Sequence, residues 1–174
     1  MATPRDIRRL ALLALCQLDA TSAAEPDLIR ASLDDLDSLA EEGLEFVDPH
    51  AAFETADRDK AFAIALAAWE HRAASDAVSL ELAPEWPAGR QPSVDRAILR
   101  LAQYEIAHGE SPPKAVVNEA VELAKAFSTE NSPAFVNAVL GKVLQRALSD
   151  GGAGLQPASE VGQVGDGPVE NRPH

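Results

Sequence analysis

Apolar residues recur every three or four positions along most of this chain, and this spacing constrains its fold more than any other feature. The clearest example begins at Thr3-Pro4, where a hydroxyl suited to capping a helix precedes a proline at the first helical position. Prolines also precede periodic segments at Pro112-Pro113 and Ser132-Pro133. No segment shows the alternation of apolar and polar residues that is typical of a strand. The sequence therefore predicts an all-α fold, a compact bundle of six to seven helices.

The boundaries of these helices follow from the periodicity and its interruptions. We expect one helix from Pro4 to about Leu18, a second from about Asp27 to Glu45, and a long third one from Asp57 to Leu82. Three more begin at Ser93, which we expect to act as a cap, and after the two proline signals. The apolar residues predicted to face inward on the third helix are Phe62, Leu66, Trp69, Ala73, Ala77 and Leu80.

Two composition changes suggest how the chain is divided. Residues 84–92 hold three prolines and form a stiff connector, so we expect residues 1–150 to comprise two helical subdomains, about 1–83 and 93–149. Residues 151–174 hold six glycines and three prolines but few apolar residues. Such a segment cannot bury enough surface to offset the entropy of ordering, so we predict a disordered C-terminal tail.

The charge is strongly negative but unevenly distributed. The formal net charge is -13, and residues 25–59 alone hold twelve acidic side chains against two basic ones. We expect this segment to be a solvated surface. The N-terminus carries Arg5, Arg8 and Arg9 close together. Because charges more than about 8 Å apart are largely screened at physiological salt, this basic end can act independently of the global sign.

Several classes of protein are disfavoured by the sequence. The single cysteine, Cys16, cannot form an internal disulfide, and on an apolar helix it is more typical of a buried thiol than of a nucleophile. The four histidines are scattered and show no metal-ligand spacing, and there is no glycine-rich phosphate loop. We therefore expect no catalytic residues, no cofactor and no metal. Neither a membrane-spanning run nor a secretory signal is visible, so a cytoplasmic protein is expected.

Three motifs in the second half carry the most specific information. They are Tyr104-Glu105, the run Asn118-Glu-Ala-Val-Glu-Leu-Ala-Lys125 that follows Pro112-Pro-Lys114, and Ser132-Pro-Ala-Phe-Val-Asn-Ala-Val-Leu140. In order and spacing they closely resemble the NusB family of bacterial transcription antitermination factors. The arginine cluster leading into Ala11–Gln17 and the pair Trp86 and Arg90 resemble it too, so the resemblance spans roughly residues 4–148.

The resemblance implies a fold of two helical subdomains and a function in transcription. NusB proteins bind the single-stranded boxA element of ribosomal RNA leader transcripts together with NusE, a small-subunit ribosomal protein, and the pair loads onto RNA polymerase. The family's arginine-rich segment falls on the N-terminus of this chain, and arginine offers a planar fork suited to phosphate. The residues expected to bind RNA are Arg5, Arg8, Arg9, Gln17 and Phe135. Because the cluster holds fewer bases than is usual in the family, RNA affinity is expected to depend on the partner.

Other motif residues are assigned to partner binding or to structure. Asp95 and Arg96 lie where the family faces NusE, so they are predicted to bind the partner, although Asp95 is also explained by the helix dipole. Tyr104, Glu105, Asn118, Glu119 and Asn137 are predicted to be structural. For Phe135, a place in the core and contact with RNA are equally compatible with the periodicity.

Two alternatives remain open from the sequence. The chain could be a protein-interaction bundle that has lost RNA binding, which its acidity and few arginines would suit. It also resembles the domain that precedes the catalytic domain of certain RNA cytosine methyltransferases, but no methyl-donor domain is present in the sequence. The sequence does not determine the oligomeric state, and a homodimer is compatible with it.

Overall fold

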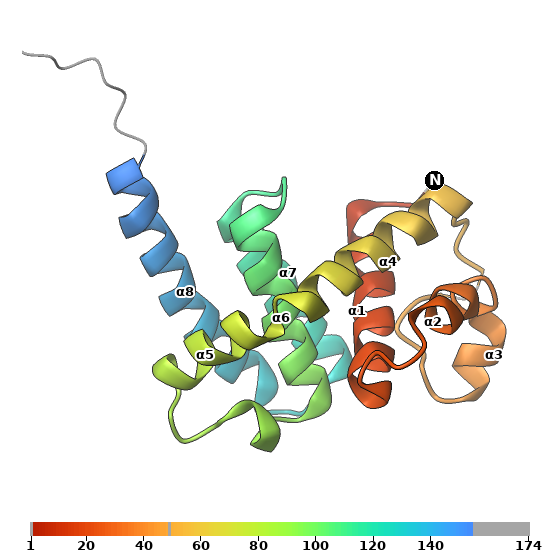
Figure 1. Cartoon of the computed structure of the whole chain (residues 1–174), viewed down its shortest axis with the longest axis horizontal. Helices are drawn as coiled ribbons and strands as arrows, with labels where there is room; N and C mark the ends of the chain where they lie inside the picture. The colour runs from red at the N-terminus through yellow and green to blue at the C-terminus, as the bar shows by residue number, and fades with distance from the viewer. Residues whose placement is uncertain (1, 49, 155–174) are drawn as a thin grey trace, which may run out of the picture.

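The computed structural model describes residues 2–48 and 50–154, and this part of the chain is helical throughout, with no strand (Figure 1). Its elements are α1 (Pro4–Thr21), α2 (Pro26–Ser32), α3 (Leu36–Glu41), α4 (Thr55–Glu70), α5 (Arg72–Leu82), a 3₁₀ turn (Ala88–Arg90), α6 (Ser93–His108), α7 (Pro113–Phe127) and α8 (Ser132–Gly154). The predicted all-α fold is confirmed.

α1 packs against α2, α4 and α6. Figure 1 shows α4 crossing it, with α2 and α3 toward one end of the molecule. The sequence predicts a single apolar stripe on α1, but Leu12 and Leu13, which lie off that stripe, are also fully buried because helices cover more than one side. Burying a leucine side chain contributes about 1.5–3 kcal/mol, so α1 supplies much of the core energy.

The helix start at Thr3-Pro4 is confirmed in detail. The Thr3 hydroxyl accepts a hydrogen bond from the Asp6 amide at 3.2 Å, and the Asp6 carboxylate accepts one from the Thr3 amide at 2.8 Å. This reciprocal capping box satisfies two amides that the helix itself cannot pair. The predicted starts of α7 and α8 are also confirmed. Ser93 is not a cap as predicted, because it is already the first residue of α6 and Pro92 precedes it.

The single helix predicted over 27–45 is wrong. The segment forms two short helices, α2 and α3, separated at Leu33–Asp35 (Figure 1). Asp35 starts the second of these, since its carboxylate accepts a hydrogen bond from the Ser38 amide at 3.1 Å. The acidic side chains on these helices are exposed, as expected of a solvated surface: Asp27, Asp34, Asp35, Asp37, Glu41, Glu42 and Glu45.

The single long helix predicted over 57–82 is also wrong, because the chain turns at His71 between α4 and α5. His71 has φ -87° and ψ 3°, outside the helical range. Arg72 stabilises the turn from inside: its guanidinium lies 3.9 Å from the centre of the Trp69 ring and donates to the Trp69 carbonyl at 2.9 Å. Neither proline nor glycine marks this break, so it depends on packing.

The turn changes which face of α5 is buried. Leu80 is 46% exposed, and Ala73 and Ala77 are exposed as well, although all three are predicted to face inward. Ser75 and Ser79 are buried in their place. The side-chain amide of Gln103 on α6 donates to the Ser79 hydroxyl at 2.9 Å and the Ser75 carbonyl at 3.2 Å. Polar pairing with α6 therefore occupies the buried face of α5, in place of the apolar residues predicted to face inward.

The C-terminal helix is longer than expected. α8 continues to Gly154, so the predicted start of the tail at residue 151 is four residues too early. The rest of the predicted tail lies outside the described residues. The connector 84–92 contains the 3₁₀ turn, and the division into two subdomains on either side of it stays a prediction. No helix in the described residues is long and apolar enough to cross a bilayer.

Candidate nucleic-acid interface

The arginine cluster is on the first two turns of α1, where the Thr3 capping box sets the helix start. Arg5 lies at the surface, with 57% of its side chain exposed, and its guanidinium is paired with Glu119 of α7. Its Nε donates to one carboxylate oxygen at 3.0 Å and its Nη2 to the other at 2.8 Å. The hydrogen bond and charge of Glu119 raise the pKa of Arg5, and the hydrogen bond from Arg5 lowers the pKa of Glu119.

Arg8 is not available to a ligand in this structure. Only 9% of its side chain is exposed, and its Nε donates to both oxygens of Glu105 on α6 at 3.0 and 3.2 Å. The Glu119 carboxylate lies 4.0 Å away as a second counter-charge. Arg8 therefore joins α1 to α6 and α7, and its predicted contact with RNA stays a prediction. Arg8 is buried because the helix turns it toward the bundle interior, while Arg5 stays at the rim.

Arg9 and Gln17 are both half-buried on α1. The Arg9 guanidinium lies 5.3 Å from the centre of the Phe127 ring, at the end of α7, within range of a cation–π contact. The side-chain amide oxygen of Gln17 accepts a hydrogen bond from the Ser32 hydroxyl at 3.3 Å. Within the described residues, Arg9 Nε and Gln17 Nε2 are buried without a hydrogen-bond partner. Arg9 is therefore the arginine of this cluster for which the described chain provides no carboxylate within 4 Å.

An aromatic cavity of about 270 Å³ lies beside the start of α8. Its walls include Trp86 from the connector and Phe135 from α8, with Asn131 and Thr129 from the α7–α8 turn. Trp86 is 52% exposed and Phe135 is half-buried, so both rings can be reached from solvent. Exposed aromatic faces are the groups on which unstacked bases stack. The same turn follows directly after Phe127, the residue under Arg9, so it connects the arginine end to this cavity.

Asp95 lies at the floor of this cavity and is only 3% exposed. Its carboxylate accepts hydrogen bonds from the Ser132 hydroxyl at 2.9 Å and from the Ser128 hydroxyl. These contacts join the start of α6 to the α7–α8 turn. The geometry thus gives Asp95 an internal role, and its predicted contact with a partner protein stays a prediction.

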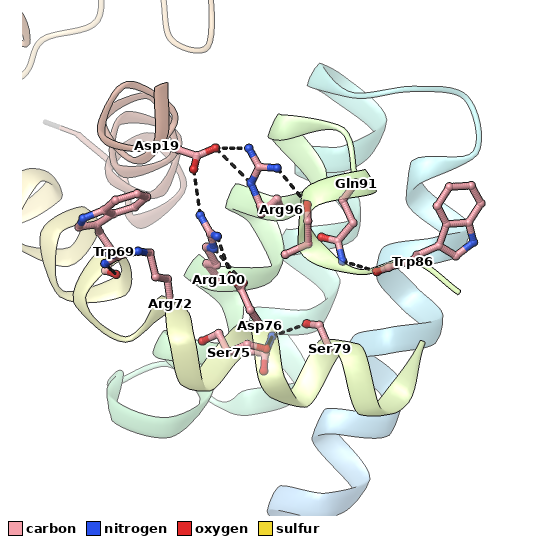
Figure 2. A network of polar contacts seen from close by, with 12 residues as sticks. Asp19, Trp69, Arg72, Ser75, Asp76, Ser79, Trp86, Gln91, Arg96 and Arg100 are labelled. Carbon is pink, nitrogen blue, oxygen red and sulfur yellow. Dashed lines mark hydrogen bonds and ion pairs between the residues drawn. The ribbon is translucent and has the colours of Figure 1, made fainter. Parts of the chain in front are cut away.

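Arg96 is likewise held by the chain itself, in the polar network drawn in Figure 2. It donates to the Asp19 carboxylate at the end of α1 and to the Ala88 carbonyl of the 3₁₀ turn at 2.9 Å. Arg100 donates to Asp19 at 3.1 Å and to Asp76 on α5 at 2.7 Å. Burial alone would lower the pKa of Arg100, but the hydrogen bonds and charges of these two carboxylates raise it overall.

This network has a consequence for the cavity. The Gln91 amide donates to the Trp86 carbonyl at 3.0 Å, and Arg96 holds the adjacent Ala88 (Figure 2). The Gln91 contact lies within the connector that carries Trp86, and Arg96 fixes this connector to α6. Asp19 accepts a hydrogen bond from Arg96 in turn. This carboxylate at the end of α1 therefore helps to position Trp86, about seventy residues further along the chain.

The motif residues predicted to be structural fall into two groups. Glu105 and Glu119 pair with Arg8 and Arg5 across helices, and their predicted structural role stays a prediction. Tyr104 is half-buried and packs on His71 and His108, with ring centres 5.4 and 5.3 Å away. Asn118 and Asn137 are exposed, and among the described residues neither side chain makes a hydrogen bond. The predicted structural role of these two asparagines stays a prediction.

Sequence reasoning missed several residues of the interface. Asn131, Thr129 and Ser128 line or support the aromatic cavity. Their one sequence signal was their place just before the Ser132-Pro133 helix start, where turn residues approach a helix N-terminus. Asp19 and Asp76 gave no signal, since their partners lie more than twenty residues away. Among the described residues there is no cluster of three or more side chains suited to a metal ion.

Comparison with known proteins decides the family. The family model described as NusB matches residues 5–145, which include the arginine cluster, the connector and all three motifs. The chain belongs to the NusB family. Two curated NusB relatives, each named transcription antitermination protein NusB, come from Symbiobacterium thermophilum and Roseiflexus sp.. The first is 41% identical over 86% of this chain and 94% of its own; the second is 38% identical over 82% and 92%.

Solved NusB structures agree with the fold. NusB of T. maritima is 28% identical and superposes with a TM-score of 0.63, covering 83% of this chain and 93% of that one. NusB of Aquifex aeolicus, at 21% identity and a TM-score of 0.61 over 91% of this chain and 97% of that one, supports the fold alone. The NusB resemblance of the three motifs is therefore confirmed at the level of the family and the fold.

Proposed function

We propose that this chain is a transcription antitermination factor that binds boxA-type single-stranded RNA of ribosomal RNA leader transcripts. It would act as a heterodimer with NusE on RNA polymerase and would need no cofactor. The observation that carries the proposal is membership of a family whose curated relatives bear the name transcription antitermination protein, over a match that begins at Arg5 itself.

The geometry supports an RNA surface with two parts. The arginine end, Arg5 and Arg9, supplies positive charge for phosphates, and the aromatic cavity, Trp86 and Phe135, supplies ring faces for bases. Single-stranded RNA is bound by this combination of cationic contacts and stacking. The exposed Asn131 at the cavity edge adds a side-chain amide that can hydrogen-bond to a base. Arg8 contributes indirectly, because its ion pairs with Glu105 and Glu119 hold α1 against α6 and α7.

The test is fluorescence anisotropy with a labelled boxA oligonucleotide, in the presence and absence of NusE. Arg5→Ala removes an exposed guanidinium and should weaken binding and reduce the salt slope by about 0.7, the value for one phosphate contact on a single strand. The matched control is Arg146→Ala, because Arg146 is also exposed and bidentate to a glutamate, Glu81, but joins α8 to α5. Equal binding by the Arg5 and Arg146 variants would contradict the arginine end.

The aromatic cavity needs a separate variant. Phe135→Leu keeps an apolar side chain in the half-buried position but removes the ring, so loss of stacking should weaken boxA binding by about tenfold. Thermal unfolding of the variant, followed by circular dichroism, checks that the helix packing is retained. Unchanged RNA affinity in a folded variant would show that Phe135 belongs to the core. A wild-type chain that binds NusE but no RNA would favour the protein-interaction bundle instead.

A further inference from the structure

The carboxylate of Glu119 occupies the hydrogen-bonding fork of Arg5. Two nearly parallel contacts of 3.0 and 2.8 Å join the two groups, one from Nε and one from Nη2. An arginine presents this same fork to a phosphate group. Because 57% of the Arg5 side chain is exposed, the fork faces a region that a ligand can enter, but its donors are already used by the chain.

Several cations surround this one acid. Arg8 lies 4.0 Å from the Glu119 carboxylate, and Arg9 lines the same cavity, of about 210 Å³, between α1 and α7. The charges of Arg5, Arg8 and Arg9 all lower the pKa of Glu119, after the hydrogen bond from Arg5. If Arg5 turned away, Glu119 would keep Arg8 as a counter-ion. Releasing Arg5 therefore does not leave the carboxylate without a positive neighbour.

We propose that Glu119 is an intramolecular competitor for phosphate, which an RNA backbone must displace from Arg5 in order to bind there. The inference rests on the proposed RNA-binding function and deepens it by naming the residue that limits affinity at the arginine end. An isolated phosphate would compete poorly against a carboxylate attached to the same fold. A strand already held at the aromatic cavity presents its phosphates at high effective concentration and displaces Glu119 readily.

The size of the effect follows from the exposure of the pair. Exposed ion pairs are worth little, with an upper range that corresponds to about fivefold in an equilibrium constant. Removing the competitor should therefore tighten RNA binding by about three- to fivefold. The expected change is a gain of affinity from a substitution within the most specific motif of the chain, whereas damage to a merely structural residue would give a loss.

The experiment compares Glu119→Gln with Glu122→Gln in anisotropy titrations with boxA RNA. Both variants remove one negative charge from α7, one turn apart, but Glu122 pairs with Lys125 at 3.0 Å and makes no hydrogen bond to Arg5. We expect about three- to fivefold tighter binding for Glu119→Gln and less than about twofold for Glu122→Gln, which reports the general charge effect. Equal gains in the two variants would overturn the proposal.

A second pair of variants isolates the competition. In an Arg5→Ala background, Glu119→Gln should raise RNA affinity no more than Glu122→Gln does, because the guanidinium for which carboxylate and phosphate compete is absent. A full gain without Arg5 would refute the inference. Thermal unfolding of each variant shows whether it folds. If Glu119→Gln does not fold, Glu119→Asp replaces it, because the shorter side chain cannot reach both donors of Arg5 and RNA binding should again tighten. A folded Glu119→Asp variant with no gain in RNA affinity would refute the proposal.

An oligonucleotide of unrelated sequence at low salt separates the two proposals. If Glu119→Gln tightens its binding and boxA shows no preference over it, the competition stands and the boxA function is wrong. If boxA is preferred and Glu119→Gln matches Glu122→Gln, the function stands and the competition is wrong. If neither oligonucleotide binds any variant, both proposals are wrong.

Discussion

Replacing Asp19 with asparagine removes the carboxylate on which two arginines of α6 converge. The Asp19 side chain is 15% exposed and accepts from Arg96 Nε and Arg100 Nη1, each at 3.1 Å, and from Arg96 Nη2. Breaking a buried ion pair by removing one partner costs about 3–5 kcal/mol. Arg100 keeps Asp76 and Arg96 keeps the Ala88 carbonyl, so the cost should fall just below this range, at about 2–3 kcal/mol.

Thermal unfolding followed by circular dichroism measures this cost. In a domain of this size 1 kcal/mol shifts Tm by about 2–4 °C, so Asp19→Asn should lower it by about 4–12 °C. The control is Glu81→Gln, which breaks a bidentate pair with Arg146 whose side chains are 65% and 43% exposed. Solvent screens this exposed pair, so that change should lower Tm by much less than Asp19→Asn does. If the two variants unfold at the same temperature, burial does not govern the strength of these pairs and the reasoning is wrong.

Three further predictions concern single positions. A Cβ at Gly109 would lie 2.5 Å from the Glu105 carbonyl oxygen, so Gly109→Ala should destabilise the fold by about 1–3 kcal/mol in denaturant titrations. A Cβ at Gly141 would meet nothing within 4 Å, so Gly141→Ala should stabilise the fold by about 0.5–1 kcal/mol in the same assay. Burial raises the pKa of Cys16 to about 12, so its alkylation at pH 8 should be slow in the native protein and fast after denaturation. The pKa of Glu119 is lower in the folded protein than its ordinary value of 4.5, so the ionised carboxylate stabilises the fold above pH 4.5. This stabilisation is lost as the pH falls through the pKa of Glu119 in the folded state. The difference in stability between wild type and Glu119→Gln should therefore shrink below about pH 4.5.

Local signals predicted the fold well wherever the cause was local. The start of α1 at Thr3-Pro4 depends on a hydroxyl and a proline that contact residues within the same turn, so the sequence contains all the information. The Asp35 cap of α3 was also present in the sequence, with Ser38 three residues further on, but continuous apolar spacing over 27–45 obscured it. The break at His71 has no proline or glycine, and the contacts of Arg72 with Trp69 that stabilise it follow no spacing rule, so the periodicity of apolar residues did not reveal it.

The candidate site was harder to predict because its contacts join distant segments. Arg5 and Arg8 pair with carboxylates 114 and 97 residues away. No spacing rule relates such positions before the fold is known, so the sequence could identify a basic cluster but not that the chain itself neutralises much of it. Family resemblance indicated which residues to examine, but only the structure distinguishes the exposed Arg5 from the buried Arg8.

This difference between neighbouring arginines changes how binding experiments on the cluster should be read. A double substitution of Arg5 and Arg8 would remove a phosphate contact and break a buried pair with Glu105 at the same time. Loss of RNA binding in such a protein could then come from a shifted α1, because a buried carboxylate left without its partner destabilises the contact between α1 and α6. Arg5→Ala and Glu119→Gln avoid this ambiguity, since they act in opposite directions on one exposed fork and leave the Arg8–Glu105 pair in place. Opposite shifts in affinity from two substitutions at one contact are what competition predicts, and a general loss of packing cannot produce them.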